Sequence, residues 1–123
     1  YYGWEQEFVQ GQYYFGGAAQ RAGGRGYSAL RAIDPVTAGM KWEFKYYTPS
    51  MAGILSTDSG LVFGGDMDGN VMAFDATSGK NLWHFQTGSS IYAAPITFML
   101  DGRQFLVLPS GTTLFAFALP ARQ

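Results

Sequence analysis

The sequence contains no cysteine, a single histidine and few charged residues. The lack of cysteine excludes a disulfide framework and thiolate chemistry within these 123 residues. Charged side chains make up 14 % of the chain, whereas an average domain has about 25 %. With a formal net charge of −1, the chain offers no basic surface for a nucleic acid or an anionic membrane. We therefore expect neither partner.

Long hydrophobic runs are also missing, although hydrophobic residues make up 47 % of the sequence. No apolar stretch approaches the length of about 20 residues that spans a bilayer. Residues 1–5 carry neither the basic segment nor the cleavage site of a signal peptide. Because the chain also does not begin with Met, we expect it to start inside a longer polypeptide. The apolar residues form short runs between 17 glycines, which favours an all-β fold with tight turns.

A short motif occurs twice at almost constant spacing. The first copy comprises Ala32, Asp34, Gly39 and Trp42, and the second comprises Ala73, Asp75, Gly79 and Trp83. Three of the four positions are 41 residues apart (75 − 34 = 41), and the glycines are 40 apart (79 − 39 = 40). A period of about 40 to 50 residues is typical of four-stranded blades in a β-propeller. A third, partial copy at 111–118 has Ala118 in place of the aspartate.

Each motif residue has a physical role that can be predicted. The aspartate follows a strand and can accept hydrogen bonds from backbone N–H groups of the next turn. The tryptophan offers a large flat ring and one N–H donor, which suit docking of an outer strand against a neighbouring blade. A single blade cannot bury both of its faces. The predicted partners are therefore the remaining blades, or further copies of the chain through exposed faces and edges.

Alternation of apolar residues between turn signals predicts the strands. They are expected at residues 13–15, 28–33, 41–46, 54–57, 61–64, 71–74, 81–86, 94–98, 105–108 and 114–118, with a loop at 20–26. The predicted fold is all-β, a partial β-propeller of two to three four-stranded antiparallel blades with tryptophan-docking motifs. Residues 1–48 would end one blade, 49–88 would form a complete blade, and 89–120 would form three strands of the last blade.

Several other residues invite a chemical interpretation, but a structural one is favoured for each. The segment 66–70 resembles the start of a calcium loop, yet Thr77 occupies the position where an EF-hand needs glutamate; a hairpin turn is preferred. His84 has no serine or acid at a recognisable catalytic spacing. Residues 23–26 lack the context of a phosphate loop, and a solvated loop is preferred for the arginines at 21, 25 and 31.

Residues 75–83 resemble the tryptophan-docking motif of the pyrroloquinoline-quinone (PQQ) dehydrogenases, the eight-bladed propellers of the methanol and alcohol dehydrogenase family. Segments 49–57, 60–65, 88–98 and 114–120 are similar to successive parts of that family's last blades. The resemblance implies the C-terminal portion of a periplasmic enzyme that oxidises alcohols or sugars with PQQ and calcium. It also implies that a strand from the N-terminal part of the enzyme completes the last blade.

The resemblance places the family's calcium ligands and catalytic acid outside this stretch. We therefore expect no catalytic or metal-binding residue here, and no PQQ or calcium held by this chain alone. The candidate cofactor contacts are Met51 and Ala52, on the loop that faces the central funnel. Methanol-type members have tryptophan where Met51 stands, which leaves backbone or van der Waals contact for this loop.

Two alternatives remain open from the sequence. The same repeat occurs in non-catalytic propellers that act as protein-interaction scaffolds. The chain could also be a small free-standing protein whose incomplete sheet associates with itself.

Overall fold

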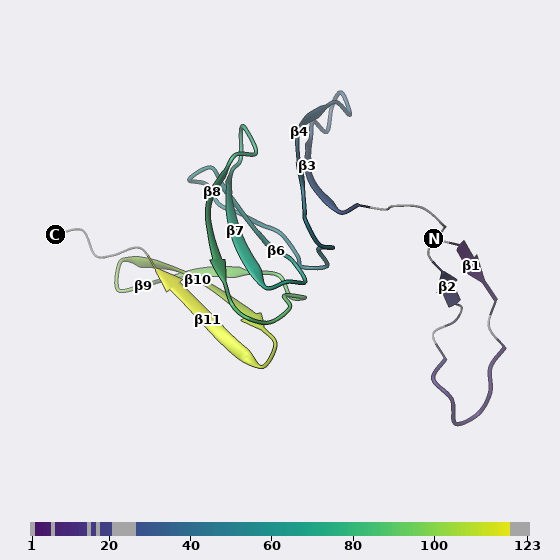
Figure 1. The fold of residues 1–123 in the computed structure, drawn as a ribbon. Helices are drawn as coiled ribbons and strands as arrows, with labels where there is room; N and C mark the ends of the chain where they lie inside the picture. The colour runs from purple at the N-terminus through teal and green to yellow at the C-terminus, as the bar shows by residue number, and fades with distance from the viewer. Residues whose placement is uncertain (1, 6, 15, 17, 21–26, 119–123) are drawn as a thin grey trace.

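The computed structural model describes residues 2–5, 7–14, 16, 18–20 and 27–118 (Figure 1). Regular structure in these ranges consists of antiparallel β-strands, without an α-helix. The strands are β1 (Tyr2–Trp4), β2 (Ala18–Gln20), β3 (Ala29–Ile33), β4 (Met40–Lys45), β5 (Leu55–Ser56), β6 (Leu61–Gly65), β7 (Asn70–Asp75), β8 (Asn81–Gln86), β9 (Ile96–Leu100), β10 (Arg103–Ser110) and β11 (Thr113–Ala118).

The strands form four sheets, each ordered as the chain runs. Strands β1 and β2 make one hairpin, and β3 and β4 make another. A four-stranded sheet has the order β5-β6-β7-β8, and a three-stranded sheet has the order β9-β10-β11. Figure 1 shows the β3–β4 sheet, the four-stranded sheet and the three-stranded sheet stacked one after another. In these three stacked sheets, strands that are consecutive along the chain pair with each other, and sheets that are consecutive along the chain are neighbours in space.

The strands predicted from residue 28 onward are confirmed, with ends that shift by a few residues. The strand predicted at 13–15 is wrong, because Tyr13 and Tyr14 lie outside any strand and Phe15 lies outside the described residues. Tyr14 instead packs edge-on against Phe8, with 5.6 Å between ring centroids. A local preference for β structure forms no strand without a paired neighbour, and here β1 pairs with β2. Gln20, predicted to lie in a loop, ends β2.

Strand β7 occupies the centre of the stack and is buried on both faces. Its residues alternate between two core clusters, since successive side chains of a strand point to opposite faces. Met72 and Phe74 join Tyr46 in a cluster shared with the β3–β4 sheet. Val71 joins Ile91, Leu106 and Leu108 in a cluster shared with the three-stranded sheet. Burial on both sides explains why this strand is a continuous apolar run rather than an alternating one.

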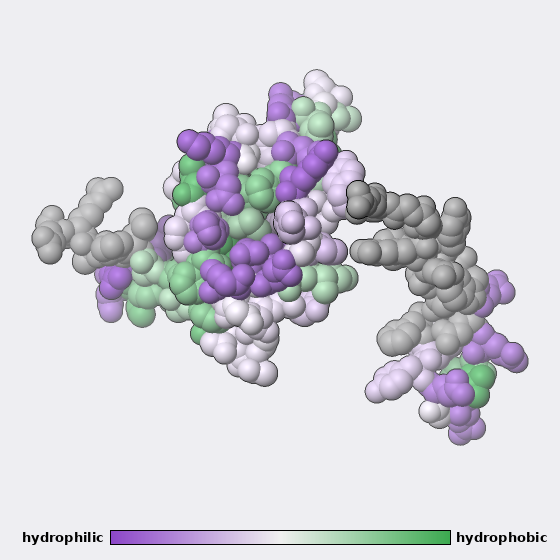
Figure 2. Space-filling view, viewed as in Figure 1, coloured by the Kyte–Doolittle hydropathy of each residue, from purple (hydrophilic) through white to green (hydrophobic). Residues whose placement is uncertain are grey.

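The two ends of the stack differ in chemistry. The outer face of the β9–β11 sheet exposes four large apolar side chains, Ile96, Phe98, Leu100 and Leu114. Figure 2 shows hydrophobic surface at the lower left of the body, where Figure 1 draws these strands. The opposite end carries charges from β3 and β4: Arg31 Nε donates to Glu43 Oε2 at 2.6 Å, and this hydrogen bond lowers the pKa of Glu43.

Candidate functional site

The side chain of Trp42 reaches from β4 to the neighbouring four-stranded sheet. Its indole Nε1 donates a hydrogen bond to the carbonyl oxygen of Ala76 at 2.9 Å. The ring also covers Gly79 so closely that a Cβ atom on that glycine would lie 2.5 Å from Trp42 Cδ2. One motif residue therefore contacts the turn that carries the other copy of the motif.

Both motif aspartates cap the turn that follows them, as the sequence predicts. Asp34 Oδ1 accepts hydrogen bonds from the backbone N–H groups of Val36 and Thr37, at 2.9 and 3.0 Å. Asp75 Oδ1 accepts hydrogen bonds from Ser78 Oγ and Ser78 N, both at 2.7 Å, and from Thr77 N at 3.1 Å. These donors stabilise the charged carboxylate. They lower the pKa of Asp34, chiefly through the Thr37 N–H, and the pKa of Asp75, chiefly through the Ser78 hydroxyl.

The structural counterpart of Gly79 is Ala38, not Gly39. Gly79 has a φ of 72° and its N–H donates to the carbonyl of Asp75 at 2.8 Å. Ala38 has a φ of 55° and its N–H donates to the carbonyl of Asp34, also at 2.8 Å. The two positions are 41 residues apart (79 − 38 = 41), the same spacing as the other three motif positions. The spacing of 40 between Gly39 and Gly79 therefore reflects a wrong match between the two motif copies.

The loop that carries Met51 and Ala52 is held from both sides. Ser50 Oγ donates to the carbonyl of Gly65 at 2.6 Å, and Ser50 N donates to Ser28 Oγ at 3.1 Å. Met51 is 68 % exposed, whereas Ala52 is partly buried and packs against the core cluster of Val71. The side chain of Met51 is thus free for an external contact, and Ala52 offers its backbone.

The chemistry of this loop fits one side of an organic anion such as PQQ. No described residue accepts a hydrogen bond from the backbone N–H groups of Met51, Ala52 or Gly53. Such groups are donors for carboxylate or carbonyl oxygens. The loop supplies no charged side chain, so it is one contact surface and not a complete site.

Calcium does not fit the part of the chain that the structure describes. No group of three or more His, Cys, Asp or Glu side chains is placed there to hold a metal ion. Asp66 is 3 % exposed, but its oxygens accept hydrogen bonds from Asn70 N and Asn70 Nδ2 at 2.9 and 2.8 Å. Residues 66–69 form the turn between β6 and β7, which confirms the predicted hairpin.

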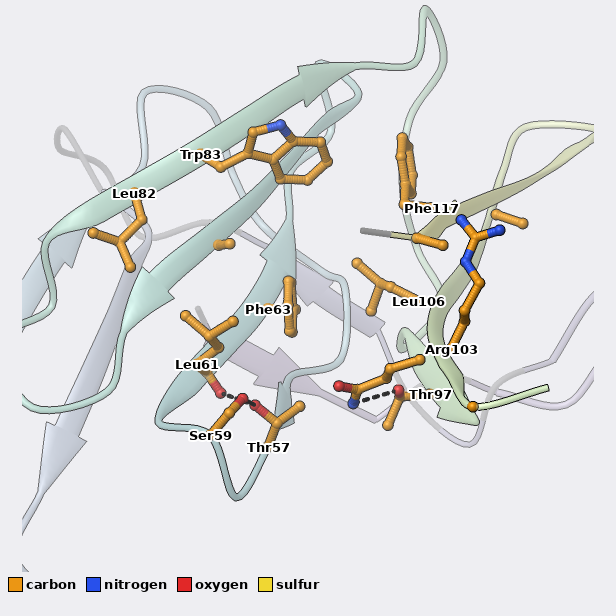
Figure 3. Close-up of a pocket in the computed structure, with 15 residues that line it drawn as sticks. Thr57, Ser59, Leu61, Phe63, Leu82, Trp83, Thr97, Arg103, Leu106 and Phe117 are labelled. Atoms are coloured by element: carbon orange, nitrogen blue, oxygen red, sulfur yellow. Dashed lines mark hydrogen bonds between the residues drawn. The ribbon is translucent and has the colours of Figure 1, made fainter. Parts of the chain in front are cut away.

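A groove of about 930 Å³ lies between the four-stranded and three-stranded sheets, and Met51 and Ala52 take no part in it. Leu82 and Trp83 of β8, Phe63 of β6 and Phe117 of β11 line it (Figure 3). The turn at 57–60 also borders it, at the end of β5 opposite the Met51 loop. The groove is largely apolar, and its aromatic wall includes a Trp83–Phe117 contact with 5.3 Å between ring centroids.

The remaining residues that the sequence singles out take structural positions. His84 is an exposed residue of β8. Arg31 pairs with Glu43 and donates to Tyr27 Oη at 2.8 Å. Residues 23–26 and the arginines at 21 and 25 lie outside the described residues. No described residue belongs to a helix with the length and hydropathy of a membrane span.

Known proteins similar to this chain include several quinoprotein alcohol dehydrogenases. The family model described as "Glucose/ethanol/alcohol dehydrogenase, beta-propeller domain" (PQQ) matches residues 23–106. The quinoprotein ethanol dehydrogenase of Pseudomonas aeruginosa is 52 % identical over 83 residues, which cover 68 % of this chain and 13 % of that relative. The quinoprotein alcohol dehydrogenase PedE of Pseudomonas putida is 50 % identical over 82 residues, covering 67 % of this chain and 13 % of that relative.

Solved structures give the same result at the level of the fold. The quinohemoprotein alcohol dehydrogenase from Comamonas testosteroni superposes with a TM-score of 0.70 at 34 % identity, covering 77 % of this chain and 14 % of that structure. BamB from Moraxella catarrhalis superposes with a TM-score of 0.53 at 19 % identity, covering 76 % of this chain and 31 % of that structure. At that identity the second likeness concerns the fold alone. The chain spans a small part, about 13 %, of the first relatives' length.

Proposed function

The chain belongs to the PQQ family of glucose, ethanol and alcohol dehydrogenase β-propellers, and from this premise we propose that it forms closing blades of a quinone-dependent alcohol or sugar dehydrogenase. In that proposal, residues 49–88 are one complete blade and residues 89–120 are three strands of the last blade. The observation that carries the proposal is the match over residues 23–106 together with 52 % identity to a quinoprotein ethanol dehydrogenase. We also propose a periplasmic location, by likeness to the family.

In this function the residues of the chain position the cofactor rather than perform the chemistry. When bound, PQQ would supply the acceptor for the hydride of the alcohol. Met51 would give a van der Waals surface to one side of it, and the backbone N–H groups of residues 51–53 would donate to its oxygens. Ser50 would hold this loop in place through its bond to Gly65. The base that takes the substrate proton and the ligands of calcium would come from other blades.

The groove beside β11 and the apolar outer face of the β9–β11 sheet are proposed contact surfaces for the remaining blades. Strand β11 has one sheet neighbour, β10, and its other edge is open among the described strands. Trp83 and Phe85, which face β11, are 39 % and 40 % exposed. A fourth strand added to this edge would cover both rings, as in strand-addition complexes. The hydrogen bond from Trp42 to Ala76 would be an example of such contact between two neighbouring blades, already formed within this chain.

Two preparations test the proposed function: the intact protein that carries this sequence, and residues 1–123 alone. Dye-linked oxidation of primary alcohols is measured with added PQQ and calcium. We expect turnover by the intact protein and none by residues 1–123. Turnover by residues 1–123 would contradict the proposal, because the base would then lie within them. An intact protein that neither binds PQQ nor oxidises alcohols or sugars would favour the non-catalytic scaffold instead.

A further inference from the structure

Tyr92 occupies the same place before the three-stranded sheet that Met51 occupies before the four-stranded sheet. The two residues are 41 positions apart (92 − 51 = 41). Each lies four positions before the first strand of its sheet, β5 at Leu55 and β9 at Ile96 (55 − 51 = 4; 96 − 92 = 4). Both side chains are exposed, Met51 by 68 % and Tyr92 by 58 %. The resemblance to the family identifies Met51 as a candidate contact but does not identify Tyr92.

The backbone around the two residues is held by corresponding hydrogen bonds. Before Met51, the carbonyl of Pro49 accepts a bond from Met67 N at 3.0 Å; before Tyr92, the carbonyl of Ser90 accepts one from Gly111 N at 3.2 Å. The residue next to Tyr92 points inward: Ile91 is fully buried, and a Cβ on Gly65 would lie 2.9 Å from its Cγ2. Tyr92 is therefore presented outward from a fixed backbone.

The two loops touch each other just beyond these residues. A Cβ atom on Gly53 would lie 2.4 Å from the Cβ of Ala94, so only glycine allows this approach. Met51 is two residues from Gly53, and Tyr92 is two residues from Ala94. An extended chain covers at most about 3.6 Å per residue, which keeps each residue within about 7 Å of the contact. The backbones of Met51 and Tyr92 therefore both lie close to this contact, at the end of the sheets opposite the turn at 57–60.

The N–H groups of the second loop match those of the first. No described residue accepts a backbone hydrogen bond from Tyr92, Ala93 or Ala94. Tyrosine adds an aromatic face, which packs on flat conjugated rings, and a phenol hydroxyl, which donates to carboxylate or carbonyl oxygens. These tyrosine groups complement a planar, anionic quinone, which offers flat conjugated rings and carboxylate and carbonyl oxygens.

We propose that Tyr92 is a further cofactor-contacting residue, which forms with Met51 a two-sided rim against PQQ. This inference rests on the proposed function, because it takes its ligand from there. Tyr92 supplies the aromatic and hydroxyl contact, and Met51 supplies the flexible apolar contact. The residue acts in binding and takes no part in proton transfer.

The test is PQQ binding by the intact protein that carries this sequence. Binding is measured through the quenching of protein fluorescence in the presence of calcium. We expect Tyr92→Ala to weaken PQQ binding about tenfold, which corresponds to 1.4 kcal/mol. Tyr92→Phe keeps the ring and is expected to weaken binding about threefold, through loss of the hydroxyl donor. Tyr47→Ala is the matched control, because Tyr47 is fully exposed on the connection that leads to Met51. Its PQQ affinity should equal that of the wild type.

The outcomes separate this inference from the proposed function. If the wild-type protein does not bind PQQ, the proposed function is wrong. If the wild type binds PQQ and Tyr92→Ala binds it equally well, the role of Tyr92 is wrong and the proposed function stands. Equal losses in Tyr92→Ala and Tyr47→Ala would also overturn the role of Tyr92. Circular dichroism melting of each variant checks folding, which a 58 % exposed side chain should leave intact.

Discussion

Trp42 lies over Gly79, and the two residues hold adjacent sheets together. The indole ring sits where a side chain at position 79 would otherwise be, and its N–H bonds to the carbonyl of Ala76 at 2.9 Å. The contact joins residues 37 positions apart (79 − 42 = 37). It requires a large ring on one sheet and a glycine with positive φ on the next. Among the described residues this pairing is seen between Trp42 and Gly79, while Ala38 takes the position of Gly79 in the first copy of the motif.

Replacement of Gly79 by alanine should destabilise the chain in two ways. A left-handed φ costs about 1–2 kcal/mol for a residue with a Cβ, and overlap with Trp42 adds about 1–3 kcal/mol. Gly60→Ala is the matched control: its φ is 79°, but nothing lies within 4 Å of an added Cβ. Urea unfolding should give a larger loss for Gly79→Ala than for Gly60→Ala. Equal losses would mean that the Trp42 contact contributes nothing.

Replacement of Trp42 by phenylalanine should cost about 1–2 kcal/mol of unfolding free energy. The change removes the hydrogen bond to Ala76, worth about 1 kcal/mol, together with part of the ring. The control is Trp83→Phe, because the Trp83 ring is 39 % exposed and packs edge-on against Phe117. We expect the midpoint in urea to fall further for Trp42→Phe. A greater loss in Trp83→Phe would contradict this assignment.

The strands of the three stacked sheets were predictable, because alternating apolar residues and glycine turns are local signals. The β1–β2 hairpin was not, since strands of three residues carry too little pattern. The position of Ala38 was missed for a different reason. Alanine rarely adopts a positive φ, so the sequence gives no signal of one. The glycine next to it, Gly39, was therefore matched with Gly79 instead. Counting 41 residues back from Gly79 would have found it.

The candidate site was only partly predictable. Met51 stood out because the family has a tryptophan there. Tyr92 carries no such motif and is identified by its position: its exposure, the anchored backbone before it and the contact between Gly53 and Ala94 appear only in three dimensions. The groove between the sheets likewise depends on how Trp83 and Phe117 meet across strands that are distant in sequence.

Replacement of Ala38 by glycine should stabilise the chain by about 0.5–1 kcal/mol. Ala38 has a φ of 55° and is exposed, so glycine relieves backbone strain there without loss of packing. Ala76→Gly is the control, because Ala76 has no positive φ; this change should lower stability through the added freedom of the unfolded chain. Urea unfolding of both variants measures the difference. A loss of stability in Ala38→Gly would contradict the claim that the positive φ of Ala38 strains the backbone.

Protonation of Asp75 should weaken the fold in acid. The Ser78 hydroxyl, the Ser78 N–H and the Thr77 N–H lower the pKa of Asp75 below its ordinary value of 3.8. The charged carboxylate therefore contributes stability above its unfolded pKa, and this contribution is lost as the pH falls through the lower, folded pKa. Asp75→Asn keeps an acceptor oxygen for the turn but removes the titration.

The expected result is a smaller loss of stability between about pH 5 and about pH 3 in Asp75→Asn than in the wild type. Ser78→Ala removes one of the three donors while the carboxylate remains, so its acid sensitivity should be intermediate. Urea midpoints measured across this range compare the three proteins. Identical slopes for Asp75→Asn and the wild type would show that the capping bonds do not favour the charged form. The remaining acid sensitivity of Asp75→Asn should come in part from Asp34 and Glu43, whose pKa values are also lowered.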